Sequence, residues 1–199
     1  MTKAGVAGRL IGSGAAIVAG SAGISHAQDV SGFYGGLGVG ANAGDFIAFG
    51  DEEYSFEGGP VTSLFVGYNV VSGNLVYGGE LAWTNKAEFS DNPYVGHATD
   101  IIDLKGRVGT MVGNTLVYGA LGYSMGDVEV DWDGASGGDV SGFSIGAGFE
   151  TNITENVYLG GDFTNRQMDG GGTINGLPGE LYMDDVNLST ISIRLGFRF

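Results

Sequence analysis

Cysteine is absent from this 199-residue chain, proline occurs three times, histidine twice, and only eight residues are lysine or arginine. Without cysteine there is no disulfide and no thiolate metal site. We expect no nucleic-acid partner, because such proteins cluster bases against phosphate and the formal net charge here is −15. Glycine is abundant, but Val, Ile, Leu, Phe and Tyr are common too, which argues against disorder. The length suits one domain.

Long apolar runs are also missing. After residue 28 no stretch approaches the ~18 consecutive apolar residues that mark a transmembrane helix. If the chain meets a bilayer, it must therefore cross as a closed barrel. Only a helix or a barrel without edges satisfies its backbone hydrogen bonds in hydrocarbon.

The first 27 residues contain no acid and are arranged like an export signal. Three features follow one another there: the bases Lys3 and Arg9, a small apolar run over 10–24, and the small-x-small pattern Ser25-His26-Ala27. They predict a signal peptide over 1–27, cut between Ala27 and Gln28, and an exported domain over 28–199. The alternative, a membrane anchor, needs about 20 apolar residues, more than this run offers.

Eight later segments have the composition and alternation of strands. They lie at roughly 32–42, 61–70, 75–84, 101–112, 115–125, 142–152, 156–167 and 187–199. Each is near the ~9–11 residues of a tilted spanning strand. Long, polar connections (43–60, 85–100, 126–141, 168–186) alternate with short ones (71–74, 113–114, 153–155). This alternation predicts an all-β fold, an eight-stranded antiparallel up-and-down transmembrane barrel.

Charges within five of these segments share one face. In 101–112, for example, one face carries Ile102, Leu104 and Val108. The opposite face carries Asp103, Lys105 and Arg107. The predicted inward charges are Glu80, Asp103, Lys105, Arg107, Glu150, Asp162, Arg166 and Arg194, with Arg198 on the same face. Their signs nearly balance, as a buried network requires. Segment 115–125 is ambiguous, since either Leu116, Tyr118 and Ala120 or Val117, Leu121 and Tyr123 face outward.

Alternation also occurs in soluble sandwiches, so two further observations matter. Aromatic side chains end the apolar faces: Phe33, Tyr68, Tyr77, Phe197 and Phe199 near the short connections, Trp83 and Phe163 toward the long ones. This pattern is typical of interfacial girdles. Glycine recurs inside the segments (Gly35, Gly36, Gly38, Gly40, Gly67, Gly78, Gly79, Gly146, Gly148). In a narrow barrel glycine leaves room for long inward side chains.

The chain ends on an alternating apolar stripe that closes with Phe199. It resembles the terminal β-signal that the barrel-assembly machinery reads, which implies Ile193, Leu195, Phe197 and Phe199 as the assembly signal. Residues 28–199 resemble the opacity-type porin family of small OmpA-like surface barrels in alphaproteobacteria. The matching stretches are Gly32-Phe33-Tyr34-Gly35-Gly36, Val76-Tyr77-Gly78-Gly79-Glu80, Ile145-Gly146-Ala147-Gly148-Phe149-Glu150 and Arg194-Leu195-Gly196-Phe197-Arg198-Phe199. The resemblance implies an eight-stranded, OmpA-like barrel in the lipid of the cell outer membrane, whereas the long connections match no family pattern. We expect a monomer.

The sequence gives little support for a catalytic site. His97 is the one histidine after residue 28, and its sequence neighbours Thr99 and Asp100 do not form an evident catalytic set. We therefore expect no enzyme and no cofactor. A weak divalent-cation hypothesis rests on the carboxylates of Asp127, Glu129, Asp131 and Asp133, which alternate along an extended segment. A hydrated, self-repelling acidic surface is the simpler interpretation.

The inward charges allow two functions. They form either a structural plug, since eight strands enclose a lumen just wide enough for side chains, or the lining of a narrow cation-preferring channel. We expect the plug, in a non-enzymatic surface protein whose barrel anchors acidic extracellular loops. The channel is the alternative, and the sequence names no surface ligand.

Overall fold

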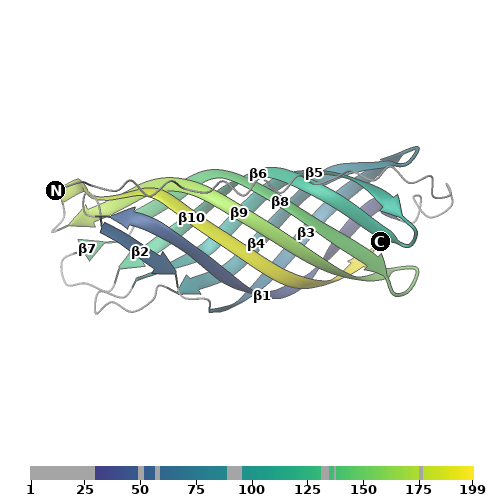
Figure 1. Cartoon of the computed structure of the whole chain (residues 1–199), viewed down its shortest axis with the longest axis horizontal. Coiled ribbons are helices and arrows are strands. Elements are labelled where there is room, and N and C mark those ends of the chain that lie inside the picture. Colours follow the sequence, from purple (N-terminus) through teal and green to yellow (C-terminus); the bar gives the residue numbers. More distant parts are fainter. Residues whose placement is uncertain are drawn as a thin grey trace, which may run out of the picture.

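The computed structural model describes residues 30–48, 52–56, 59–88, 96–130, 135–136, 138–174 and 177–199. They form one barrel whose long strands tilt across its axis (Figure 1). The strands are β1 (Gly32–Ala48), β2 (Glu52–Phe56), β3 (Pro60–Ser72), β4 (Leu75–Glu88), β5 (Gly96–Val112), β6 (Thr115–Val130), β7 (Ala135–Ser136), β8 (Gly138–Asn152), β9 (Val157–Ile174) and β10 (Leu177–Arg198). In these described ranges, no helix has the length and apolar character to cross a bilayer.

Eight of these strands make the closed wall, in the order β1, β3, β4, β5, β6, β8, β9 and β10. Every neighbouring pair is antiparallel, and β10 pairs with β1 from Tyr34↔Arg198 to Ala48↔Met183, which closes the cylinder. The predicted eight-stranded up-and-down barrel is confirmed. Two short strands add to one rim only, where β2 pairs with β1 and β7 pairs with β9.

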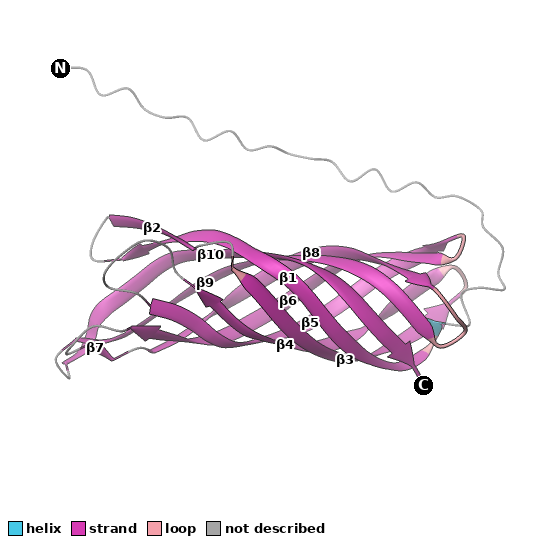
Figure 2. Cartoon of the chain, turned by 90° about the horizontal axis from the view of Figure 1, so that it is seen from below, coloured by secondary structure: helices cyan, strands magenta, loops and turns pink. Residues whose placement is uncertain are grey.

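The short connections lie together at the rim that also holds the C-terminus (Figure 2). Gly73 and Gly113 each open a two-residue turn with a φ of 62°. A side chain is strained in that left-handed conformation, so glycine is the suitable residue at the start of both hairpins. We call this end the short-turn rim and the opposite end the outer rim.

Strands continue far into the segments predicted as long connections. β9 runs to Ile174 and β10 begins at Leu177, and the segments 43–60, 85–100 and 126–141 are likewise largely strand where the structure describes them. The prediction of long loops there is wrong. The cause is physical: the strands were predicted from an apolar outward face, and the described outward residues of these extensions, such as Thr62, Asp139 and Gln167, are polar.

The polarity of the wall inverts along the strands. On β10 the outward residues Ile191 and Ile193 are exposed, but farther toward the outer rim Leu188 and Val186 point inward and are buried. The same inversion places these buried apolar residues on the inside of four other strands: Val61, Ile101, Val140 and Met168. Exposed polar residues face outward beside them, such as Thr62, Asp139, Gln167 and Asp185. Near the short-turn rim the barrel is therefore built for lipid, and toward the outer rim it is built for water.

In β6, for which the sequence leaves the inward and outward faces open, the structure identifies both faces. Leu116, Tyr118 and Ala120 face the lumen and are buried, while Val117, Leu121 and Tyr123 face outward and are exposed. Leu116 and Tyr118 pack with three other buried side chains, Val30, Val76 and Met111. This apolar cluster fills the lumen near the short-turn rim.

Inward glycines accommodate three buried tyrosines. The ring of Tyr34 lies over Gly67, that of Tyr118 over Gly148, and that of Tyr158 over Gly196. A Cβ at any of these glycines would stand well inside contact distance of the tyrosine. The prediction that glycine makes room for long inward side chains therefore holds at Gly67 and Gly148, and Gly196, which was not predicted, has the same role.

Candidate functional site

The lumen at the level of the apolar outer face is filled by charged side chains. All the residues predicted for the inward face are buried there: Glu80, Asp103, Lys105, Arg107, Glu150, Asp162, Arg166, Arg194 and Arg198. They come from β4, β5, β8, β9 and β10, so the network joins opposite walls of the barrel. A buried charge is costly unless it is paired, and each of these has a partner of opposite sign.

Glu80 is the centre of the larger group. Its carboxylate accepts hydrogen bonds from Arg107 Nη1 at 2.8 Å and from Arg194 Nη2 at 2.7 Å. Lys105 Nζ lies 3.2 Å from Oε1, and the Tyr34 hydroxyl donates to Oε2 at 3.0 Å. One carboxylate on β4 is thus held by side chains of β1, β5 and β10.

Two more carboxylates extend this group toward both ends. Glu150 accepts from Arg107 Nη2 at 2.6 Å and from Arg198 Nη2 at 2.7 Å. Asp162 accepts from the Tyr118 hydroxyl at 2.7 Å and lies 3.3 Å from Arg194 Nη1 and 3.4 Å from Lys105 Nζ. The result is a continuous chain of alternating charge from β8 to β9 across the lumen.

Asp103 and Arg166 form a separate pair nearer the outer rim. Arg166 donates twice to the Asp103 carboxylate, from Nε at 2.7 Å and from Nη2 at 2.6 Å. Ser124 donates to Asp103 Oδ1 at 2.6 Å, and Arg166 Nη1 donates to the Thr190 hydroxyl at 2.7 Å. Such a bidentate geometry is the strong form of an arginine–carboxylate contact.

Aromatic rings stack on three of the lumen arginines, Arg107, Arg194 and Arg198. The Arg107 guanidinium carbon lies 4.8 Å from the ring centre of Tyr34 and 4.1 Å from that of Tyr118. Arg194 lies 3.5 Å above Phe65, and Arg198 lies 4.1 Å above Tyr158. The rings supply cation–π contacts and fill volume that the strands leave open. None of these aromatics was predicted as part of the site, although Tyr34 alternates with the outward Phe33 and could have been found by that alternation.

A small cavity lies inside the described part of the lumen. It has a volume of about 20 Å³ and lies between the two charged groups, bordered by Ser63, Thr84, Thr164 and Ser192 among others. A single water needs roughly 10–15 Å³ of such volume, so the cavity holds about one water. The apolar cluster around Val30 and Leu116 lies on one side of the charges, and buried Leu188 and Met168 lie on the other.

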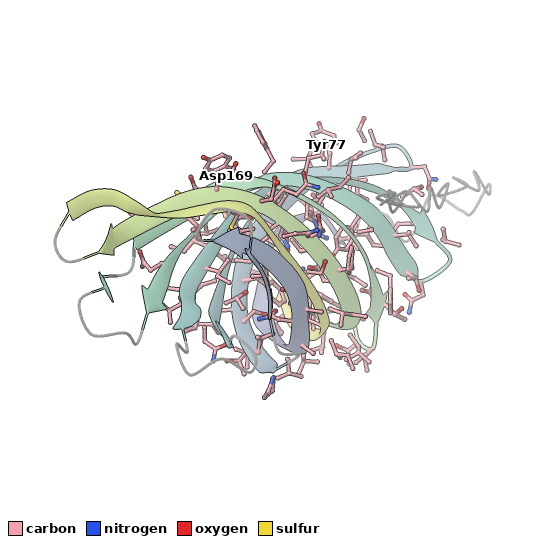
Figure 3. The ribbon with its side chains drawn as sticks, turned by 60° about the vertical axis from the view of Figure 1, so that its left-hand side comes forward. Tyr77 and Asp169 are labelled. Carbon is pink, nitrogen blue, oxygen red and sulfur yellow. The ribbon has the colours of Figure 1, made fainter. Side chains whose placement is uncertain are left out.

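Exposed aromatics surround the outside of the short-turn rim. Phe33 and Tyr68 are in edge contact with ring centres 4.7 Å apart, and Phe197 and Phe199 are 5.2 Å apart. Figure 3 labels Tyr77 on this part of the wall and Asp169 toward the other end, and both project outward. Trp83 is half-buried, and its indole N–H donates to Asp100 at 2.8 Å, where the apolar face ends.

Other predicted residues lie elsewhere or outside the described part of the chain. Ala27, Gln28, Asp131 and Asp133 are outside it. Asp127 and Glu129 lie on β6, and the backbone of Glu129 pairs with that of His97 on β5. Within the ranges that the structure describes, no three His, Asp or Glu side chains gather as a metal site.

Comparisons with known proteins agree with this architecture. The family model of the outer membrane protein beta-barrel domain matches residues 13–199. The 22 kDa outer membrane protein of Rhizobium leguminosarum bv. viciae is 33% identical over 141 residues, which are 67% of this chain and 62% of that relative. The match thus spans less than two thirds of the relative's length.

Solved structures share the fold. Neisserial surface protein A has a TM-score of 0.55 at 15% identity, covering 85% of this chain and 98% of that protein. Ail, the attachment invasion locus protein of Yersinia pestis, has a TM-score of 0.52 at 16% identity, covering 85% and 99%. The outer membrane protein AlkL, determined in lipid bilayers, has a TM-score of 0.51 at 17% identity, covering 91% and 94%. At these identities the similarity establishes the fold alone.

Proposed function

The chain belongs to the outer membrane protein beta-barrel domain family and is located in the cell outer membrane, and on this premise we propose that it is a rigid, non-enzymatic anchor that presents an acidic outer rim to cationic macromolecules at the cell surface. In this proposal the short-turn rim faces the periplasm and the outer rim faces the exterior. The charges in the lumen stabilise the barrel and close it to solutes.

One observation carries the proposal: the bases lie in the lumen of the barrel, whereas most of the acids belong to segments toward the outer rim. After residue 27 the chain has a single base, Lys86, apart from the five in the lumen. Four acids pair with those five bases, and most of the 23 acids of the chain belong to the segments toward the outer rim. Exposed carboxylates on the described part of that wall are Asp100, Asp127, Asp139, Asp169 and Asp185. A field of one sign favours partners of the opposite sign and speeds their encounter.

The acidic rim also stands well clear of the lipid. From Ser189 to Leu177, β10 extends about 12 residues beyond the apolar outer face. At about 3.3 Å per residue and a tilt near 40°, this corresponds to roughly 30 Å along the barrel axis. The buried apolar side chains inside the extension support a rigid shape. A rigid, raised rim is better suited to contact with large partners than to the transport of solutes.

The alternative function is a narrow cation-preferring channel, which the acidic rim would favour. Its path would have to pass Arg107, Arg194 and the apolar cluster at the short-turn rim. An enzyme is a weaker candidate, since His97 is the one histidine after residue 28 and its sequence neighbours form no evident catalytic set. We therefore expect planar bilayers containing the protein to remain silent, and proteoliposomes to bind oligolysine with an affinity that falls as salt rises. Conductance steps would favour the channel, and the absence of salt-dependent oligolysine binding would remove the proposed role of the rim.

Assembly and export complete the proposal. Ile193, Leu195, Phe197 and Phe199 form an exposed apolar stripe on the last strand, available to the barrel-assembly machinery before closure against β1. Residues 1–27 serve as the signal peptide, with cleavage between Ala27 and Gln28. The closed wall leaves the eight long strands paired on both sides at the level of the lipid, which supports a monomer.

A further inference from the structure

The outward face of β9 and β10 changes from apolar to polar just beyond the exposed Phe163 and Ile191. The next outward residues toward the outer rim carry three amides and one hydroxyl: Asn165 and Gln167 on β9, Asn187 and Ser189 on β10. We call these four residues the amide patch. In the register of the two strands, Ser189 lies opposite Asn165 and Asn187 lies opposite Gln167.

Hydrogen bonds hold the amide patch in one arrangement. Asn165 Nδ2 donates to Asn187 Oδ1 at 2.6 Å and to Ser189 Oγ at 2.9 Å. These contacts use both amide hydrogens of Asn165. Among the described residues, the side chain of Gln167 and the amide nitrogen of Asn187 have no hydrogen-bond partner. Both are on the outer wall and are available to a ligand.

Amides inside two neighbouring strands need a physical reason, because asparagine is depleted in strands. β9 and β10 both continue beyond the amide patch in each direction, so the patch is not a strand end. The lumen does not require these residues either, since their side chains face outward. Their chemistry therefore reflects what surrounds the barrel at this height.

The amide patch lies at the height of lipid headgroups. The headgroup region adds about 5–8 Å to each side of the hydrocarbon core. Asn165 and Gln167 are two positions apart on a strand, which corresponds to about 5 Å along the barrel axis at a tilt near 40°. Asp169, which Figure 3 labels, is the next outward residue and belongs to the acidic outer rim. The amide patch thus fills the layer between the lipid-facing residues and that rim.

Exposed aromatic rings adjoin the amide patch. Phe143 on β8 lies opposite Gln167 and is 77% exposed. Tyr123 on β6 packs edge-on against Phe143 with ring centres 5.7 Å apart, and its hydroxyl shares a hydrogen bond of 3.0 Å with Ser141. Amides beside an exposed ring suit a sugar, because its hydroxyls bond to the amides while its C–H face packs against the ring.

Charge decides between classes of lipid headgroup. Every lysine and arginine whose side chain the structure describes is buried in the lumen, so no described base on the outer wall is placed to bind a lipid phosphate. The exposed carboxylates of Asp169 and Asp185, just beyond the amide patch, repel an anion but accept hydrogen bonds from hydroxyls. We propose that the amide patch binds the uncharged sugar headgroup of a glycolipid in the leaflet next to the outer rim. The proposal uses the location in the outer membrane and is independent of the partner proposed for the acidic rim.

A second copy of the chain is a poorer occupant of this surface. Two amide patches in contact would bring Asp169 and Asp185 of both copies close together, and like charges oppose association. A glycolipid meets no such repulsion, and its acyl chains continue along the apolar wall below the amide patch. The surface is therefore continuous with the wall that the lipid already covers.

The test uses the full-length protein in phosphatidylcholine nanodiscs that contain a minor fraction of digalactosyl diacylglycerol or, for comparison, of the anionic phosphatidylglycerol. Native mass spectrometry measures how often each lipid stays bound relative to its share in the disc. We expect the galactolipid to be enriched about fivefold, which corresponds to one net hydrogen bond, and phosphatidylglycerol not to be enriched. The side-chain NH2 signals of Gln167 and Asn187 should shift in NMR spectra with the galactolipid and not with phosphatidylglycerol.

Protein variants give a second, independent measurement. Gln167→Ala combined with Asn187→Ala removes the two available amides without changing the charge, and the enrichment should be lost. Asn74→Ala is the matched control, because Asn74 is exposed and its amide also donates to a hydroxyl, that of Thr110 at 2.6 Å, but at the short-turn rim. It should bind the galactolipid like the parent. Folding is checked by the shift in gel mobility on heating, and the comparison of the two lipids stands even if the double variant does not fold.

Four results would overturn the inference. The galactolipid could bind no more often than its share predicts, or phosphatidylglycerol could be enriched equally or more, which would assign the surface to a lipid phosphate. Enrichment that survives in the double variant would locate the sugar elsewhere on the barrel. A dimeric mass that the double variant abolishes would show a second copy as the occupant. None of these results changes the expected binding of oligolysine to the outer rim, so the two proposals are tested separately.

Discussion

Arg194 on β10 donates to Glu80 on β4 at 2.7 Å across the lumen, although the two residues are 114 positions apart in the chain. In the sheet β10 is paired with β1 and β9, so this contact joins it to a strand that is not its neighbour, β4. Glu80 therefore makes its full set of contacts only when β10 is in place. Completion of the charge network requires closure of the barrel.

Replacing Glu80 should be among the most damaging single substitutions. Glu80→Ala leaves Arg107, Arg194 and Lys105 with one carboxylate fewer in a buried site, and removal of one partner of a buried pair costs about 3–5 kcal/mol. Urea unfolding in lipid vesicles, followed by fluorescence of the two tryptophans, measures the loss. Leu81→Ala, the next residue on the exposed face, is the control and should cost much less. A loss below about 1 kcal/mol for Glu80→Ala would contradict a tightly coupled network.

Substitutions at Asp103 and Arg166 can separate the effect of charge on stability from the effect of side-chain shape. Asp103→Leu and Arg166→Met should each destabilise the barrel strongly, because each leaves its partner buried and unpaired. The double variant should recover much of the loss, since replacing both partners by apolar groups is often nearly neutral. A double-mutant cycle in the same unfolding assay gives the coupling. Additive losses would indicate that Ser124 and Thr190, and not the pair itself, hold these side chains.

The alternation of charge and apolar residues predicts much of this structure. A strand has a period of two, so Arg194 between Ile193 and Leu195 identifies both faces at once. The same alternation predicts the inward face for all the charges that are buried in the lumen. It did not identify which charges pair, because pairing depends on the stagger between strands. Nothing in the sequence alone fixes the register that brings Glu80 opposite Lys105.

Outside the lipid the same reasoning fails for a physical reason. Leu188 and Val186 are apolar and inward, the reverse of Ile191 and Ile193 on the same strand. A search for one continuous apolar outward face therefore ends the strand near residue 187, whereas β10 begins at Leu177. The reversal marks a change of solvent along a single strand. A test for opposite polarity beyond each predicted end would have found the extension.

The glycines under the tyrosines make a matched pair of substitutions possible. Gly196→Ala would place a Cβ against the ring of Tyr158, with Leu195 and Phe197 on either side of it already fixed in the wall. We expect a cost of about 1–3 kcal/mol from this overpacking. Gly79→Ala is the control, because the nearest atom to its new Cβ is Lys105 O at 3.9 Å. It should be neutral or slightly stabilising. Equal effects in the unfolding assay would show that the tyrosine does not need the glycine.

The polarity inversion predicts where a charge becomes costly on the outer wall. Ile193→Lys places an ammonium on the lipid-facing part of β10, where it should cost about 2–4 kcal/mol. Gln167→Lys places the same group on the outward face of β9 beyond the inversion, where the cost should fall to about 0–1 kcal/mol. Both side chains are exposed, so the two variants differ in surroundings and not in packing. Unfolding in lipid vesicles measures the cost of each variant. If the two variants lost similar free energies of unfolding in vesicles, the bilayer would reach past Gln167. The part of the barrel that projects from the lipid would then be shorter than proposed.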